Sequence, residues 1–180
     1  MRSIVRTFRD KFRGIPKDAP LDYSPIIENL YIGAWPTRYN VETIKSLGVR
    51  LIISTILEKP DKELGEPPLR LVRVRATDMG KRLIFPDNQI MKGVEAALPA
   101  LEAGEGVMVF CKAGKHRSAT LTACILVGLG YPADDAIRTV EQARSKADFK
   151  DSHRQRIRSF EQLWREKHPD LPVRKAGQNV

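Results

Sequence analysis

Short apolar segments alternate with amphipathic segments along most of this chain. Four apolar segments have the length and the branched or aromatic residues that strands favour: 29–33, 49–56, 69–74 and 107–110. Helical spacing of apolar residues occurs in 40–47, 88–101, 117–129, 133–145 and 151–167. Because strands that alternate with helices usually pair in parallel, we expect an α/β fold in which helices flank a central, mostly parallel sheet of four to five strands.

Polar residues and glycines mark the expected ends of these helices. Asn40 and Asp87 each precede a helical segment and are expected to cap it, and Gly48 follows the end of the first one. Ligands of parallel sheets bind at the carboxyl ends of the strands. The segment that follows 107–110 is therefore the first place where a site is expected.

The first 24 residues differ in character from the rest. Within 2–13, apolar residues share one helical face and arginines lie largely elsewhere: Ile4, Val5, Phe8 and Phe12 against Arg2, Arg6, Arg9 and Arg13. This pattern suits peripheral contact with an anionic membrane or a transit peptide, and it also suits a packed or frayed terminal helix. With a Pro-rich connector at 15–25, we divide the chain into a basic N-terminal segment and connector (1–24), a folded unit (25–168) and a tail (169–180).

Charge is concentrated at the two ends of the chain. The 180 residues carry a net charge of +9, of which +4 lies in 1–20 and +5 in 138–180, while the middle is balanced. A basic protein favours anionic partners. Aromatic residues make up only 7% and no groove-reading motif is present, which argues against nucleic acid as the partner.

Two cysteines, Cys111 and Cys124, allow at most one disulfide. The first twenty residues have no apolar run of signal-peptide length, and the longest uncharged stretch, 118–133, is too short and too polar to span a bilayer. We therefore expect a cytoplasmic protein with no transmembrane segment, and a monomer. Cys124 lies in an apolar helical segment and is expected to belong to the core.

The strongest motif is the loop CKAGKHRS, which runs from Cys111 to Ser118 between a strand and a helix. Backbone N–H groups of such a loop, together with the helix N-terminus, form an anion site and also stabilise a thiolate. We expect Cys111 to be a nucleophile and Ser118 to donate a hydrogen bond to its sulfur. The six residues expected to surround a substrate phosphate are Lys112, Ala113, Gly114, Lys115, His116 and Arg117.

Two of these residues have a distinct expected role. Gly114 permits the strained turn that the loop requires. Arg117 offers a planar fork that binds two phosphate oxygens and the charge that develops during phosphoryl transfer.

The loop resembles the signature of the cysteine-dependent protein tyrosine phosphatase superfamily, in particular its small dual-specificity branch. The resemblance covers about 25–165 and includes the segment 27–33, which is similar to the opening strand of that family. It implies a phosphatase fold and hydrolysis through a cysteinyl-phosphate, with neither cofactor nor metal. Phe110 stands where the family has a histidine that orients the loop, so a higher pKa of Cys111 and slower turnover are expected.

The resemblance also implies a general acid. Asp78 follows the 69–74 segment and precedes the nucleophile by 33 residues, as the family's acid does. The same carboxylate would then activate water for the second step. The alternative for Asp78 is a turn before Gly80, and Asp87 is the second candidate for the acid.

The substrate class is less constrained by the motif. A protein tyrosine or dual-specificity phosphatase acting on a phosphorylated protein is the first interpretation. Lys112 and Lys115 also make the loop similar to lipid phosphatases of the phosphoinositide and phosphatidylglycerophosphate types, so an anionic phospholipid is the alternative. Two further alternatives remain: a non-catalytic phosphate-binding module, and an enzyme that handles sulfur or arsenate.

The three histidines, His116, His153 and His168, are spaced unlike a zinc site. We expect His153 and His168 to face solvent on the last helix.

Overall fold

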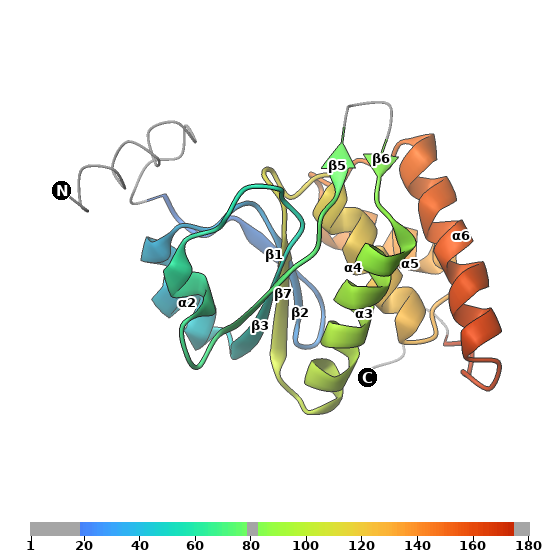
Figure 1. The fold of residues 1–180 in the computed structure, drawn as a ribbon, viewed down its shortest axis with the longest axis horizontal. Coiled ribbons are helices and arrows are strands. Elements are labelled where there is room, and N and C mark those ends of the chain that lie inside the picture. The colour runs from blue at the N-terminus through green and yellow to red at the C-terminus, as the bar shows by residue number, and fades with distance from the viewer. Residues whose placement is uncertain (1–18, 79–82, 175–180) are drawn as a thin grey trace.

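The computed structural model describes residues 19–78 and 83–174, so the predicted helix at 2–13 lies outside the described residues (Figure 1). Five strands form the main sheet in the order β1-β2-β7-β3-β4: β1 (Tyr23–Ile27), β2 (Leu30–Gly33), β7 (Gly106–Phe110), β3 (Val49–Ser54) and β4 (Arg70–Arg73). The pair β1 and β2 is antiparallel and the other three pairs are parallel. The predicted sheet is confirmed.

Strand β7 lies at the centre of the sheet. Val109 is in register with Ile32 on one side and with Ile53 on the other. All five residues of β7 are buried, because both edges of the strand are paired and both faces of the sheet are covered. The loop after Phe110 therefore leaves the sheet at its middle.

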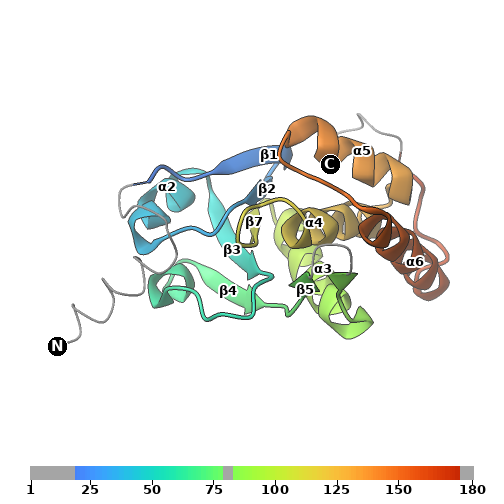
Figure 2. The same cartoon turned by 90° about the horizontal axis from the view of Figure 1, so that it is seen from above.

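Helices cover the two faces of the sheet unequally (Figure 2). Four long helices pack on one face: α3 (Asp87–Glu102), α4 (Arg117–Gly128), α5 (Ala133–Ala143) and α6 (Asp151–Lys167). The other face carries three short elements: the 3-10 helices η1 (Arg38–Asn40) and η2 (Lys62–Gly65), and α2 (Val41–Ser46). Alternate residues of β7 serve the two cores, so Val109 packs with the four helices and Phe110 packs on the α2 side.

Two strand segments differ from the prediction. Strand β1 begins within the predicted connector, because its edge position and antiparallel pairing tolerate Pro25. A small hairpin, β5 (Thr77–Asp78) with β6 (Leu83–Ile84), was not predicted, because two-residue strands leave no periodic pattern. Asp78 therefore belongs to a strand instead of an open loop.

The position of the predicted cap at Asn40 is confirmed, and the predicted cap at Asp87 needs correction. Asn40 does occupy the N-cap position of α2, but its side chain accepts from the Thr37 N–H at 2.9 Å and donates to the Ala19 carbonyl at 3.0 Å. Pro86 is the N-cap of α3, and Asp87 is its first helical residue. The Asp87 carboxylate instead pairs with Arg156 of α6, so long-range pairing replaced the local cap.

Within the described parts of the chain, none of the helices combines the length and the apolar character that crossing a bilayer requires.

Candidate active site

The loop at 111–116 connects β7 to α4, and α4 begins at Arg117. Gly114 adopts φ 65°, in the left-handed region that favours glycine, and its backbone N–H donates to Cys111 Sγ at 3.2 Å. From the first turn of α4, Ser118 Oγ donates to the same sulfur at 3.2 Å. The structure thus brings Cys111, Gly114 and Ser118 together, with two donors directed at one sulfur.

The surroundings of Cys111 favour its ionised form. Burial raises the pKa of this thiol. Hydrogen bonds from the Ser118 hydroxyl and from the backbone N–H groups of Ser118, Lys115 and Ala113 together lower it by more, so the net pKa is below its usual value. Cys124 shows the opposite behaviour. It is fully buried in the apolar part of α4, and burial raises the pKa of its thiol well above the usual range. Cys111 is therefore the cysteine with thiolate character, and Cys124 has the predicted core position.

Phe110 enters the loop without the polar side chain of the family's histidine. It is fully buried in the core on the α2 side. Its carbonyl oxygen accepts from both the backbone N–H and the hydroxyl of Thr55, each at 3.0 Å. Thr55 thus fixes the backbone at the start of the loop, and the net pKa of the neighbouring thiol is lowered despite the phenylalanine.

A buried arginine donates hydrogen bonds to the backbone of the loop. Arg144, 2% exposed at the end of α5, donates through Nε to the Gly114 carbonyl at 3.0 Å and through Nη1 to Asp22 Oδ1 at 3.0 Å. Burial opposes ionisation of Asp22, but its bonds with Lys146 and Arg144 hold the pKa of that carboxyl below its usual value. No sequence signal marked Arg144, because its acidic partner lies 122 residues away.

Asp78 lies beside the loop through one short contact. Its Oδ2 is 2.6 Å from Nδ1 of His116, and the two side chains are 11% and 23% exposed. The other ring nitrogen of His116, Nε2, is 3.4 Å from Asp148 Oδ2. Asp148 also pairs with Lys150, and these contacts, the one from Lys150 foremost, lower the pKa of its carboxyl. His116 therefore links the predicted acid to a second carboxylate.

The prediction that His153 faces solvent is wrong. This residue is fully buried, because its spacing places it on the same face of α6 as Ile157, Phe160 and Trp164. That apolar spacing was the signal in the sequence that could have identified it. His168, by contrast, is exposed and its ring lies 4.1 Å from that of Trp164.

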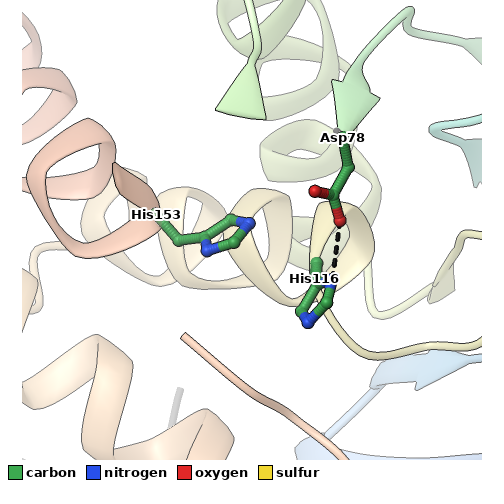
Figure 3. A group of neighbouring side chains, drawn as sticks. All are labelled: Asp78, His116 and His153. Carbon is green, nitrogen blue, oxygen red and sulfur yellow. Dashed lines mark hydrogen bonds and ion pairs between the residues drawn. The ribbon is translucent and has the colours of Figure 1, made fainter. Parts of the chain in front are cut away.

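One group of side chains has the composition of a metal site. Asp78, His116 and His153 each offer a potential ligand atom, and these atoms lie within 4.8 Å of one another (Figure 3). The fold, and not the spacing along the chain, brings them together.

Basic side chains lie in and beside the loop. Arg117 is half-buried, and in the described part of the chain no carboxylate forms an ion pair with it. Lys112 and Lys115 are exposed and line a pocket of about 480 Å³ together with Trp35, Asp22 and Lys146. Its remaining wall is largely apolar: Ala19, Pro20, Ala34, Pro36 and Ala113, with Asn40.

Comparison with known proteins identifies relatives that match most of the chain. No protein-family model matches the chain. The human phosphatidylglycerophosphatase and protein-tyrosine phosphatase 1 is 32% identical over 148 residues, which cover 74% of this chain and 71% of the human one. The mouse protein of the same name is 30% identical over 116 residues, which cover 64% of this chain and 54% of the mouse one.

Solved structures share the fold. The crystal structure of PTPMT1 superposes with a TM-score of 0.73 at 24% identity, covering 82% of this chain and 98% of that one. The complex of PTPMT1 with PI(5)P gives a TM-score of 0.72 at 24% identity, covering 81% and 98%. The chain belongs to the family of phosphatidylglycerophosphatase and protein-tyrosine phosphatase 1, within the cysteine-dependent protein tyrosine phosphatase superfamily.

Proposed function

We propose that the chain hydrolyses phosphomonoesters through a cysteinyl-phosphate formed on Cys111. The observation that carries this proposal is the pair of donors, Ser118 Oγ and the Gly114 N–H, that contact Cys111 Sγ at 3.2 Å. A thiolate held by donors within a strand-to-helix loop is a ready nucleophile near neutral pH.

Each expected residue has a role in the two steps. The thiolate attacks phosphorus while Arg117 binds two of the phosphoryl oxygens, and Asp78 protonates the departing oxygen. Water then attacks the phosphorus, Asp78 takes the proton from that water, and the S–P bond breaks. Ser118 stabilises the departing thiolate with its hydroxyl. The backbone N–H groups of Lys112 to Arg117 surround the phosphate, and no metal takes part.

The substrate that the site supports best is an anionic phospholipid with a terminal phosphomonoester. Lys112 and Lys115 form no ion pair among the described residues, and they line a pocket that also contains the ion pair between Asp22 and Lys146. The rest of the pocket wall is largely apolar. A pocket of about 480 Å³ is within the range of small-molecule sites, which spans roughly 300–1,000 Å³. Mixed cationic and apolar lining suits a lipid head group, and the names of the relatives include a phosphatidylglycerophosphatase. The catalytic unit would span 25–168.

A phosphorylated protein is the second candidate. The sequence favours it, and the names of the same relatives include a protein-tyrosine phosphatase. A peptide would present its phosphate to the same loop but would carry less negative charge toward the two lysines.

Turnover without added metal distinguishes the candidates. The substrates are phosphatidylglycerophosphate and PI(5)P in vesicles, a phosphotyrosyl peptide and a phosphoseryl peptide, each compared between the wild type and the double variant Lys112→Ala with Lys115→Ala. We expect the double variant to lose about tenfold more kcat/KM on the lipids than on the peptides. The control is Lys45→Ala with Lys62→Ala, which removes the same charge from lysines paired with Glu42 and Glu66. Equal losses on all substrates would favour the phosphoprotein.

A further inference from the structure

The carboxylate of Asp78 lies close to two histidines that come from separate parts of the chain. His116 belongs to the phosphate-binding loop and His153 to α6 (Figure 3). The rings of the two histidines stack with centroids 5.1 Å apart and planes at 26°. His116 contacts Asp78 at 2.6 Å, and a ligand atom of His153 lies within 4.8 Å of both other side chains.

The hydrogen on His153 is located by the start of its own helix. The Lys150 backbone N–H donates to His153 Nδ1 at 3.0 Å, so Nδ1 is the acceptor and the neutral ring carries its hydrogen on Nε2. Burial lowers the pKa of His153, and this effect outweighs the opposite effect of the Asp78 and Asp148 carboxylates. A neutral ring with hydrogen on Nε2 follows.

That Nε2 is buried and has no hydrogen-bond partner among the described residues. A buried donor without an acceptor is costly, so its position calls for an explanation. A metal ion would need a lone pair on this nitrogen, which carries the hydrogen. A carboxylate, by contrast, only accepts, and an oxygen of the Asp78 carboxylate lies within 4.8 Å of a ring nitrogen of His153.

We infer that His116 and His153 are positioning residues for Asp78, which they hold from two sides over the phosphate-binding loop. This inference rests on the proposed function. One hydrogen lies between His116 Nδ1 and Asp78 Oδ2, and Asp78 is a carboxylate when the hydrogen is on nitrogen and an acid when it is on oxygen. Asp78 passes its proton to the leaving oxygen as the P–O bond breaks and the S–P bond forms. His153 Nε2–H then donates to the new carboxylate, which is held in place until it accepts a proton from water.

Asp148 orients the His116 ring from the opposite side. Its carboxylate faces Nε2 at 3.4 Å and is itself paired with Lys150 Nζ at 2.7 Å. With both ring nitrogens facing carboxylates, rotation of the ring away from Asp78 is disfavoured. A histidine at this loop position thus ties the acid to the phosphate site.

Two substitutions of His116 separate its two contacts. In His116→Asn the amide nitrogen takes the place of Nδ1 and keeps a donor toward Asp78. In His116→Gln the amide nitrogen takes the place of Nε2 and keeps only the contact with Asp148. The readout is kcat/KM on a series of aryl phosphates whose leaving groups range from activated to poor. We expect His116→Gln to lose about tenfold or more on the poor leaving groups and much less on the activated ones. His116→Asn should retain most of the wild-type profile.

The equivalent pair at His153 tests the second contact. His153→Asn keeps an oxygen for the Lys150 N–H but lacks the donor toward Asp78, whereas His153→Gln keeps that donor. We expect the leaving-group effect in the first variant only. The control is His168→Asn, on the exposed end of α6, and thermal melting identifies any variant that fails to fold. Because His153 is buried, the His116 pair decides the question if the His153 variants unfold.

Four outcomes would overturn the inference. In the first, both His116 variants lose the same factor on every substrate. In the second, added Zn²⁺ stimulates turnover or a chelator abolishes it, which would assign the three side chains to a metal. In the third, the wild type hydrolyses no aryl phosphate and forms no phosphoenzyme, which would refute the proposed function as well. Wild-type turnover with an unchanged leaving-group profile in His116→Gln refutes the positioning role alone.

Discussion

The guanidinium of Arg144 lies directly against Gly114, with Nε donating to the Gly114 carbonyl at 3.0 Å. A Cβ added at Gly114 would clash with Arg144 Nη2 and would lie 2.9 Å from the backbone of Gly33. The residue also adopts φ 65°. The loop therefore has no room for a side chain at this position.

We expect Gly114→Ala to abolish oxyanion binding. The substitution combines about 1 kcal/mol of left-handed backbone strain with displacement of Arg144 or of the Gly33 backbone. The measurement is the thermal shift that inorganic phosphate or tungstate produces. The matched control is Gly104→Ala, at φ 72° with no atom within 4 Å of an added Cβ, which carries the same strain without the clash. A Gly114→Ala protein that still binds the anion would show that the loop adjusts freely.

Ser118→Ala should raise the pKa of Cys111. The hydroxyl is the largest of the contacts that lower this pKa, and only burial, which acts in the other direction, is larger. Because the pKa of the folded protein is lowered, ionisation stabilises the fold above the unfolded-state pKa, and this contribution is lost as the pH falls through the folded-state value. The variant loses its thiolate at a higher pH than the wild type.

The rate of alkylation by iodoacetamide against pH measures this shift. Near neutral pH the Ser118→Ala protein should react more slowly than the wild type, and Ser118→Thr, which keeps a hydroxyl, should remain close to it. Cys111→Ser provides the baseline, because buried Cys124 is not expected to react in the folded protein. An identical pH profile in the alanine variant would remove Ser118 from the ionisation of Cys111.

The periodicity of apolar residues predicted the main sheet and the four long helices, and the loop motif indicated where the candidate site lies. Strand β7 is a continuous apolar run because both its faces are buried, and the loop is recognisable because its chemistry needs a cysteine, a glycine and an arginine at fixed spacing. The residues that lie against the loop and against Asp78 had no such signal. Arg144 and His153 lie close to residues that are more than 29 positions away in the sequence. The tertiary fold brings such residues together, and local spacing does not reveal it. For the same reason Asp87 paired with Arg156 instead of capping its helix.

Arg117→Lys should lower kcat by about 10²–10³-fold on an aryl phosphate, the usual loss when a donor to the developing charge is removed. An ammonium keeps the charge but cannot bind two phosphoryl oxygens in the plane of a fork. Cys111→Ser should lose turnover entirely while it still binds phosphate or tungstate. Arg158→Lys, at an exposed arginine that pairs with Asp134, is the control for the exchange itself. Near-normal turnover in Arg117→Lys would show that another residue binds the phosphate.

Asp78→Asn should slow substrates with poor leaving groups far more than activated ones. An amide cannot donate a carboxyl proton, and an activated aryl oxygen departs with little protonation, so its rate depends less on the acid. The measurement is kcat/KM across the same series of aryl phosphates used for the His116 variants. Asp87→Asn is the matched control, because its carboxylate is already engaged by Arg156 at the start of α3. If Asp87→Asn alone shows the leaving-group effect, the acid is Asp87, and the contact between Asp78 and His116 then has only a structural role.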